Sequence, residues 1–170
     1  MKKIFALVLA LVLALSIAAF AEEQPVDIES IYEGTWVTFE DDGFNMYIPS
    51  DWVELELDQE LIESSGFYYA VASADGACTF QLAWLPIEAE MDIAALQAEI
   101  ASVYPEAAVV ALNGFDAVCY ADAEVGILTF AVLDQADLGV YYFNFTPASN
   151  EEMVVLASLM MASISPVEAE

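Results

Sequence analysis

Alternating hydrophobic and polar positions predict β-strands over most of this 170-residue chain. The clearest strand lies in residues 44–52, where Phe44, Met46 and Ile48 share one side and the sequence Pro-Ser-Asp-Trp then turns the chain. Comparable strand patterns occur at 35–40, 53–57, 67–74, 78–85, 107–112, 115–121, 126–133 and 140–146.

Turn signals between these segments predict antiparallel hairpins. Asp41-Asp42-Gly43, Asp75-Gly76 and Asn113-Gly114 each separate two strand segments, and short turns of this composition join adjacent antiparallel strands. The acidic residues of 54–63 favour an exposed edge of the sheet, where charge discourages pairing with other chains.

Two segments have helical spacing instead. Ile93, Leu96, Ile100 and Val103 recur every three or four residues, after an aspartate that can cap the first turn. The second helix is expected over 149–163, where Ser-Asn-Glu-Glu forms a capping box and polar positions are rare. The chain is therefore predicted to have an α+β fold, with an antiparallel sheet of about seven strands and helices packed on its faces in an α/β/α sandwich.

The first 21 residues have the organisation of a secretory signal peptide. Lys2 and Lys3 precede an apolar run, and Ala19-Phe20-Ala21 is a small-x-small site, so cleavage is expected after Ala21. Retention of the run as a membrane anchor is the alternative. No lipid-attachment cysteine follows the run, and no later segment is apolar enough to span a bilayer. These features predict a secreted or extracytoplasmic protein without membrane insertion after cleavage.

The rest of the chain is expected to form one domain. Residues 22–33 are polar and are predicted to be a flexible leader. Residues 34–166 contain all the strand and helix patterns, and 167–170 are predicted to be an acidic tail. A domain of this length can bury a substantial hydrophobic core.

The charge balance excludes some classes of partner. The chain has 29 Asp and Glu, no His, and only two Lys or Arg, which are Lys2 and Lys3 of the predicted signal peptide. Nucleic-acid binding is excluded, because it depends on basic side chains that meet phosphates. Anionic membranes should repel the protein for the same reason. The acidity favours solubility, and nonspecific divalent-cation binding or a basic partner is the alternative.

Most of the residues that enzymes use are missing. Without His there is no Ser-His-Asp or Cys-His arrangement, and without Lys after the signal peptide there is no Schiff-base chemistry. A hydrolase that uses two carboxylates remains as the alternative, but no acidic pair lies in an apolar setting that would raise a pKa. We therefore expect no catalytic residue, no cofactor and no enzymatic activity.

Two groups of residues are weak candidate sites. Glu40, Asp41 and Asp42 could offer oxygen ligands to Ca²⁺, although they lack the spacing of an EF-hand loop and a solvated turn is the simpler interpretation. Cys78 and Cys119 could form a disulfide in an exported protein or remain free thiols, because spacing alone does not show whether their Cα atoms approach.

Aromatic residues offer a third candidate. Tyr141, Phe143 and Phe145 share one side of the last strand and could form a platform for glycans or apolar ligands on an uncovered face. The two helix patterns predict that both faces are covered, so these rings are expected in the core. The methionines of the last helix are likewise expected to serve packing.

The order of these features resembles the PsbP-like family, especially its small exported bacterial members, and the Mog-type proteins share this fold. The matching segments are 44–52, 113–120, 141–147 and 159–164. The resemblance implies an antiparallel sheet between helices. In the plant members it implies a non-catalytic role on the surface of photosystem II, and in the Mog-type members binding of a small GTPase. No residue here carries either function over, because the chain lacks the histidines and basic residues of those interfaces.

Together these features predict a non-catalytic secreted or envelope-associated domain that binds an unknown envelope or extracellular protein. A small secreted hydrolase that uses two carboxylates and a weak Ca²⁺-binding domain are the alternatives.

Overall fold

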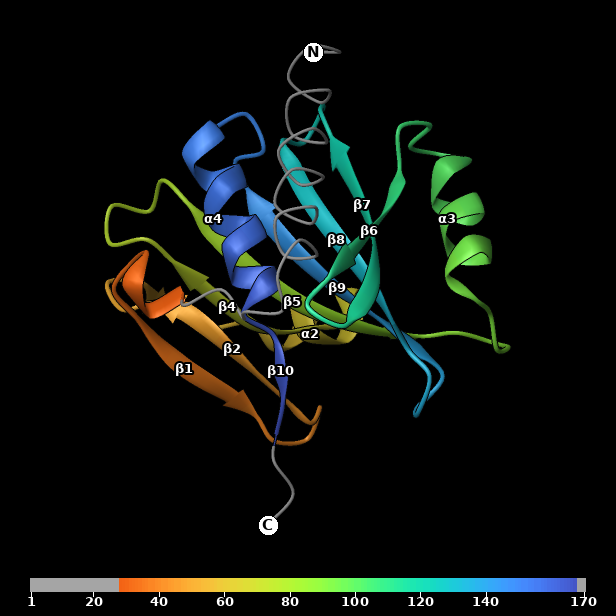
Figure 1. Ribbon diagram of the computed structural model, residues 1–170, viewed down its shortest axis with the longest axis horizontal. Coiled ribbons are helices and arrows are strands. Elements are labelled where there is room, and N and C mark those ends of the chain that lie inside the picture. Colours follow the sequence, from red (N-terminus) through yellow and green to blue (C-terminus); the bar gives the residue numbers. More distant parts are fainter. Residues whose placement is uncertain (1–27, 168–170) are drawn as a thin grey trace.

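A seven-stranded antiparallel sheet forms the centre of the fold in the computed structural model, which describes residues 28–167 (Figure 1). Its strand order is β3-β4-β5-β9-β8-β7-β6. The strands are β3 (Val53–Glu54), β4 (Phe67–Ala72), β5 (Thr79–Pro86), β6 (Ala108–Leu112), β7 (Phe115–Asp122), β8 (Ile127–Asp134) and β9 (Gly139–Thr146). The predicted hairpins at 75–76 and 113–114 join β4 to β5 and β6 to β7.

A second, three-stranded sheet has the order β1-β2-β10, with β1 (Gly34–Phe39), β2 (Phe44–Pro49) and β10 (Ser165–Pro166). Figure 1 shows β10, in blue, beside the orange hairpin of β1 and β2. Phe44, Met46 and Ile48 all face the core, as predicted. The sequence did not predict that this hairpin leaves the main sheet, because the strand that completes the small sheet comes from the opposite end of the chain.

The described residues form three α-helices, α2 (Gln59–Ser65), α3 (Ile93–Ala101) and α4 (Glu151–Ala162), and the 3₁₀ turn η1 (Ile28–Ser30). Helix α2 was not predicted, and the expected strand over 53–57 is shortened to β3. Asp58 caps α2 by accepting a hydrogen bond from the Glu60 N–H, and Gly66 ends it in the left-handed conformation at φ 71°. The acidic residues of 54–63 therefore belong only partly to a sheet edge.

The two predicted helices are confirmed, with two corrections. Asn150 caps α4 in place of the preceding serine, since its side chain accepts from the N–H groups of Glu152 and Met153. Val103 lies beyond the end of α3 and is 70% exposed, so it does not extend the apolar stripe. Asp92 caps α3, as expected.

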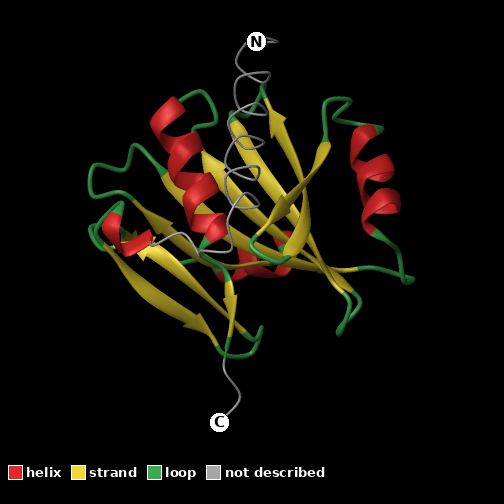
Figure 2. Cartoon of the chain, in the orientation of Figure 1, coloured by secondary structure: helices red, strands yellow, loops and turns green. Residues whose placement is uncertain are grey.

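Helices cover both faces of the main sheet, which confirms the predicted α+β sandwich (Figure 2). On one face α4 and the small sheet enclose a core that includes Phe143, Phe145 and the methionines Met46, Met153, Met160 and Met161. On the other face, Leu96 of α3 packs with residues of β7, β8 and β9. The interpretation of the β9 aromatics as core residues is confirmed for Phe143 and Phe145, while Tyr141 is partly exposed.

Part of the predicted leader, residues 28–33, lies within the described structure. Ile28 is only 5% exposed, and the Tyr32 hydroxyl donates to the Tyr47 carbonyl oxygen at 2.7 Å. Residues 28–33 are thus folded onto the small sheet, because two apolar side chains anchor this otherwise polar segment. At the other end, the Val167 N–H donates to the Gly43 carbonyl oxygen at 2.9 Å.

The predicted signal peptide, its cleavage after Ala21, the leader up to residue 27 and the tail at 168–170 lie outside the described residues. Within residues 28–167, no helix has the length and apolar character needed to cross a bilayer.

Candidate functional site

A cluster of hydroxyl and carboxylate groups joins the turn of the small sheet to the main sheet. The Asp42 carboxylate accepts one hydrogen bond from the Tyr68 hydroxyl and another from the Tyr141 hydroxyl, both at 2.9 Å. Burial and the Asp42 carboxylate raise the pKa of both tyrosines, because ionisation would place a second negative charge there. Nearby, the Trp84 indole N–H donates to Asp134 at 3.1 Å and its ring lies directly over Gly139, where a side chain would overlap it.

The candidate Ca²⁺ ligands do not assemble into a cage. Glu40 and Asp41 are exposed, whereas both oxygens of Asp42 accept tyrosine hydroxyls. Across residues 28–167, no group of three or more Cys, Asp or Glu side chains is placed to hold a metal ion. Asp42 therefore links the small sheet to the main sheet through these two hydrogen bonds.

Replacing Asp42 with alanine is expected to lower the free energy of unfolding by about 1–2 kcal/mol, because the exposed Tyr68 hydroxyl and the partly buried Tyr141 hydroxyl lose a charged acceptor. The Asp41→Ala variant is the matched control, because Asp41 is exposed and makes neither of these hydrogen bonds. Urea unfolding monitored by circular dichroism measures the free energy of unfolding of both variants. Equal stability of the two variants would contradict the role of Asp42 in joining the two sheets.

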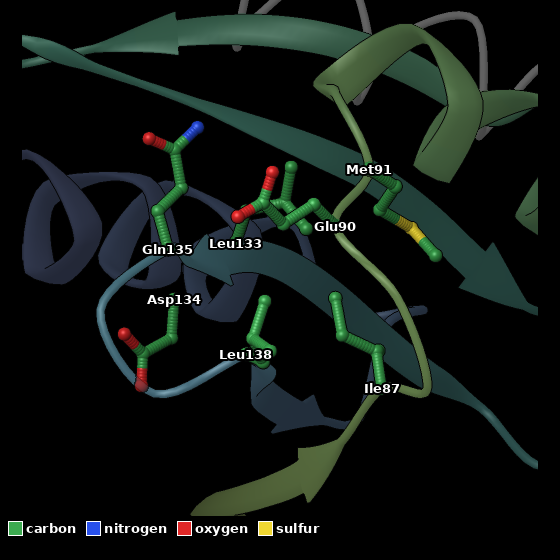
Figure 3. Close-up of a pocket in the computed structure, with 7 residues that line it drawn as sticks. All are labelled: Ile87, Glu90, Met91, Leu133, Asp134, Gln135 and Leu138. Carbon is green, nitrogen blue, oxygen red and sulfur yellow. The ribbon is translucent and has the colours of Figure 1, made fainter.

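A hollow of about 250 Å³ lies between the connection that follows β5 and the turn between β8 and β9 (Figure 3). Its lining residues are Ile87, Glu90, Met91, Leu133, Asp134, Gln135 and Leu138. Asp134 and Glu90 supply its two carboxylates, and the Asp134 carboxylate points away from that of Glu90.

The Asp134 carboxylate caps the turn between β8 and β9. One of its oxygens accepts from the N–H groups of Ala136 and Asp137 at 3.0 and 3.2 Å, and the other accepts from Trp84. A two-carboxylate hydrolase needs an acid and a base that face each other across the scissile bond. The two carboxylates of this hollow do not have that arrangement.

Asp75 and Asp122 have a lowered pKa, and both cap turns. Hydrogen bonds from backbone N–H groups lower the pKa of Asp75 in the β4–β5 turn and of Asp122 in the β7–β8 turn. Such bonds favour the ionised carboxylate, whereas a general acid at neutral pH needs a raised pKa. Their geometry indicates a structural role for both.

A wider hollow of about 510 Å³ lies where the edge strand β3 leaves the main sheet. We call it the edge groove and define it by its lining residues Glu54, Leu55, Glu56, Leu57, Ile62, Tyr68, Tyr69 and Ala70. Sequence reasoning missed it because α2, which contributes Ile62, was not predicted. A third hollow of about 350 Å³ follows α3 and is lined by Val103, Tyr104, Pro105, Glu106, Ala107, Tyr120 and Ala121.

The two cysteines are free thiols and lie far apart. Cys119 lies on β7, and two strands, β8 and β9, separate β7 from β5. Across these strands Cys119 is level with Leu82 of β5. Three strand spacings place Cys119 about 14 Å from β5, and Cys78 lies four residues further along. A disulfide needs Cα atoms within about 7 Å, so the structure does not bring this pair together. Burial raises the pKa of Cys119 to about 12.

No protein-family model matches the sequence, and none of the curated proteins matches it. Among solved structures, the chain is similar to cyanobacterial PsbP (CyanoP) from Synechocystis sp. PCC 6803, with a TM-score of 0.55 and 10% identity over 79% of this chain and 92% of that one. It is also similar to LpqN, described as involved in cell envelope biogenesis of Mycobacterium tuberculosis, with a TM-score of 0.44 and 17% identity over 79% and 91% of the two chains. The likeness to CyanoP confirms the PsbP-like fold that the sequence resemblance predicted.

Proposed function

We propose that this protein is an exported, non-catalytic domain that binds a protein partner at or outside the cell envelope. The observation that carries the proposal is that the carboxylates in the candidate sites serve to hold the fold together. Asp42 and Asp134, the best-placed carboxylates, are both occupied by hydrogen bonds that hold the fold together. Within the described residues, every buried side-chain nitrogen or oxygen has a hydrogen-bond partner.

The surface supports a binding role. Large apolar side chains are exposed beside the edge groove, including Val53, Leu55 and Tyr68. Exposed apolar side chains grouped around a hollow, with polar residues at the rim, are typical of interaction surfaces. The signal-peptide pattern of residues 1–21 supports the exported location.

Capture of a partner tests the proposal. Immobilised mature protein, beginning at Glu22, is incubated with envelope and secreted fractions of its own source at physiological ionic strength. We expect one protein to be retained in a saturable manner and to bind again after purification. The control is the same chain unfolded in urea before coupling, which keeps the charge and loses the surface.

Two results would contradict the proposal. One is retention that is identical on the unfolded control, because net charge alone would then explain it. The other is turnover of an ester or glycoside substrate that is lost when a single carboxylate is replaced by its amide, because that result would favour the two-carboxylate hydrolase.

A further inference from the structure

The edge groove exists because β3 is too short to cover β4. Only Val53 and Glu54 pair with β4, and one more bond, from the Leu55 N–H to the Ala70 carbonyl oxygen at 2.9 Å, extends the ladder. The chain then turns away to Asp58, the N-cap of α2. Tyr68 lies in the irregular part of β4, where the register with β5 shifts, and it has no strand partner on this side in the described chain.

The groove is lined by both apolar and acidic side chains. Leu55 and Tyr68 are 39% and 38% exposed, large fractions for side chains of their size. Glu54 lies close enough to Tyr69 that burial and this carboxylate together raise the pKa of the tyrosine to about 12. A volume of about 510 Å³ is within the range of roughly 300–1,000 Å³ that binding pockets occupy.

The carboxylates of the groove have no cation within the described chain. Residues 28–167 contain no Lys, Arg or His, so Glu54 and Glu56 cannot form an intramolecular salt bridge there. No side chain of residues 28–167 can supply a positive charge to this surface. A second copy of the domain would bring further acidic residues to the groove, and its charge would oppose binding.

We propose that the edge groove binds an extended, basic segment of the protein partner, in which lysine or arginine alternates with apolar residues; this inference rests on the proposed function. The alternation follows from residues 54–57, where Glu54 and Glu56 are interleaved with Leu55 and Leu57. An extended chain repeats its side-chain direction every two residues. Its apolar side chains can therefore contact Leu55 and Leu57 while its cations meet the carboxylates of Glu54 and Glu56.

A fluorescent peptide of alternating leucine and lysine tests the inference by anisotropy at physiological ionic strength. Glu54→Gln/Glu56→Gln is expected to weaken its binding about tenfold, and the matched pair Glu88→Gln/Glu124→Gln, exposed elsewhere, to change it less than about twofold. Melting temperatures check that both variants are folded. A peptide of the same composition with its lysines and leucines in separate blocks is expected to bind more weakly to the unmodified protein.

Two further variants separate the groove from general charge attraction. Leu55→Asp and Val125→Asp each place one more acidic residue at an exposed apolar position, and only Leu55 lines the groove. We expect Leu55→Asp to weaken binding, because it removes an apolar contact, and Val125→Asp to leave it unchanged. Tighter binding to both, or equal loss in both glutamine pairs, would overturn the inference in favour of adsorption by net charge.

The two proposals fail in different ways. If the immobilised protein captures a partner and the Glu54→Gln/Glu56→Gln variant captures it equally well, the groove is not the binding site, but the proposed function stands. If no partner is captured from any fraction while the peptide binds the groove, the chemistry of the groove is supported and the proposed function fails.

Discussion

Truncation of Phe80 to alanine is expected to lower the free energy of unfolding by about 3–5 kcal/mol. Phe80 is fully buried on β5, and its ring stacks against Phe145 at 5.0 Å and Phe143 at 6.3 Å between centroids. Loss of the ring leaves a cavity in the core on the face of the main sheet that α4 and the small sheet cover. Because the whole stability of a domain is about 5–15 kcal/mol, this change removes a large fraction of it.

Leu85→Ala is the matched control for Phe80→Ala. Leu85 lies on the same strand and is 41% exposed, so its truncation removes apolar atoms without opening an internal cavity. Guanidinium unfolding curves measure both free energies. A loss of less than about 1 kcal/mol in Phe80→Ala would show that the core collapses around the missing ring, which would contradict close packing of the aromatic residues.

The folded protein is expected to be stable and insensitive to pH between about 7 and 9 and then to unfold cooperatively as the pH rises from 10 to 12. Burial is the largest cause of a raised pKa at seven of the eight tyrosines. These tyrosines are Tyr32, Tyr68, Tyr69, Tyr104, Tyr120, Tyr141 and Tyr142.

The direction in which stability changes with pH follows from the linkage between proton binding and folding. A tyrosine pKa near 10.0 in the unfolded chain rises to about 12 for Tyr69 and Tyr120 in the folded chain. The folded state then holds protons that the unfolded state releases, so the stability that these two tyrosines contribute is fully present below pH 10 and is lost as the pH rises through 12. The plateau below about pH 9 follows because the chain has no His and no Lys or Arg beyond Lys2 and Lys3. Above that pH the Cys119 thiol, whose pKa burial raises from 9.0 to about 12, adds to the loss of stability.

Melting temperatures against pH, with tyrosinate absorbance at each pH, test this expectation. Tyr120→Phe is the informative variant, since Tyr120 stacks on Tyr104 at 4.6 Å and phenylalanine keeps the ring but cannot ionise. We expect its melting temperature to fall less steeply above pH 10 than that of the unmodified protein. Ionisation of all tyrosines near pH 10 without loss of the folded state would contradict the expectation.

Local features of the chain were predictable from sequence because short-range forces determine them. The corner after residues 44–48, the glycine turns and the caps of α3 and α4 depend on hydrogen bonds between residues a few positions apart. Helix α2 was missed although Asp58 and Gly66 mark its ends, because its acidic, weakly periodic residues suggested the continuation of an edge strand.

The candidate sites were less predictable, because they depend on residues distant in sequence. Asp42 was expected in a solvated turn, yet it receives hydroxyls from β4 and β9, the second of which is 99 residues away. Nothing in the local sequence of Asp42 indicates that two tyrosines will meet it. The free cysteines and the edge groove likewise follow from strand order, which hydrophobic periodicity does not encode.

The sequence by itself therefore determined most of the strands, the helices α3 and α4, the hairpins, the core-facing side of β2 and the absence of basic side chains after Lys3. Only the tertiary structure decided that β1 and β2 form a separate sheet with β10, that Asp42 joins the two sheets, and that β3 ends early enough to leave the edge groove open. Periodicity and turn chemistry act over a few residues, whereas these features arise from the packing of whole elements against one another.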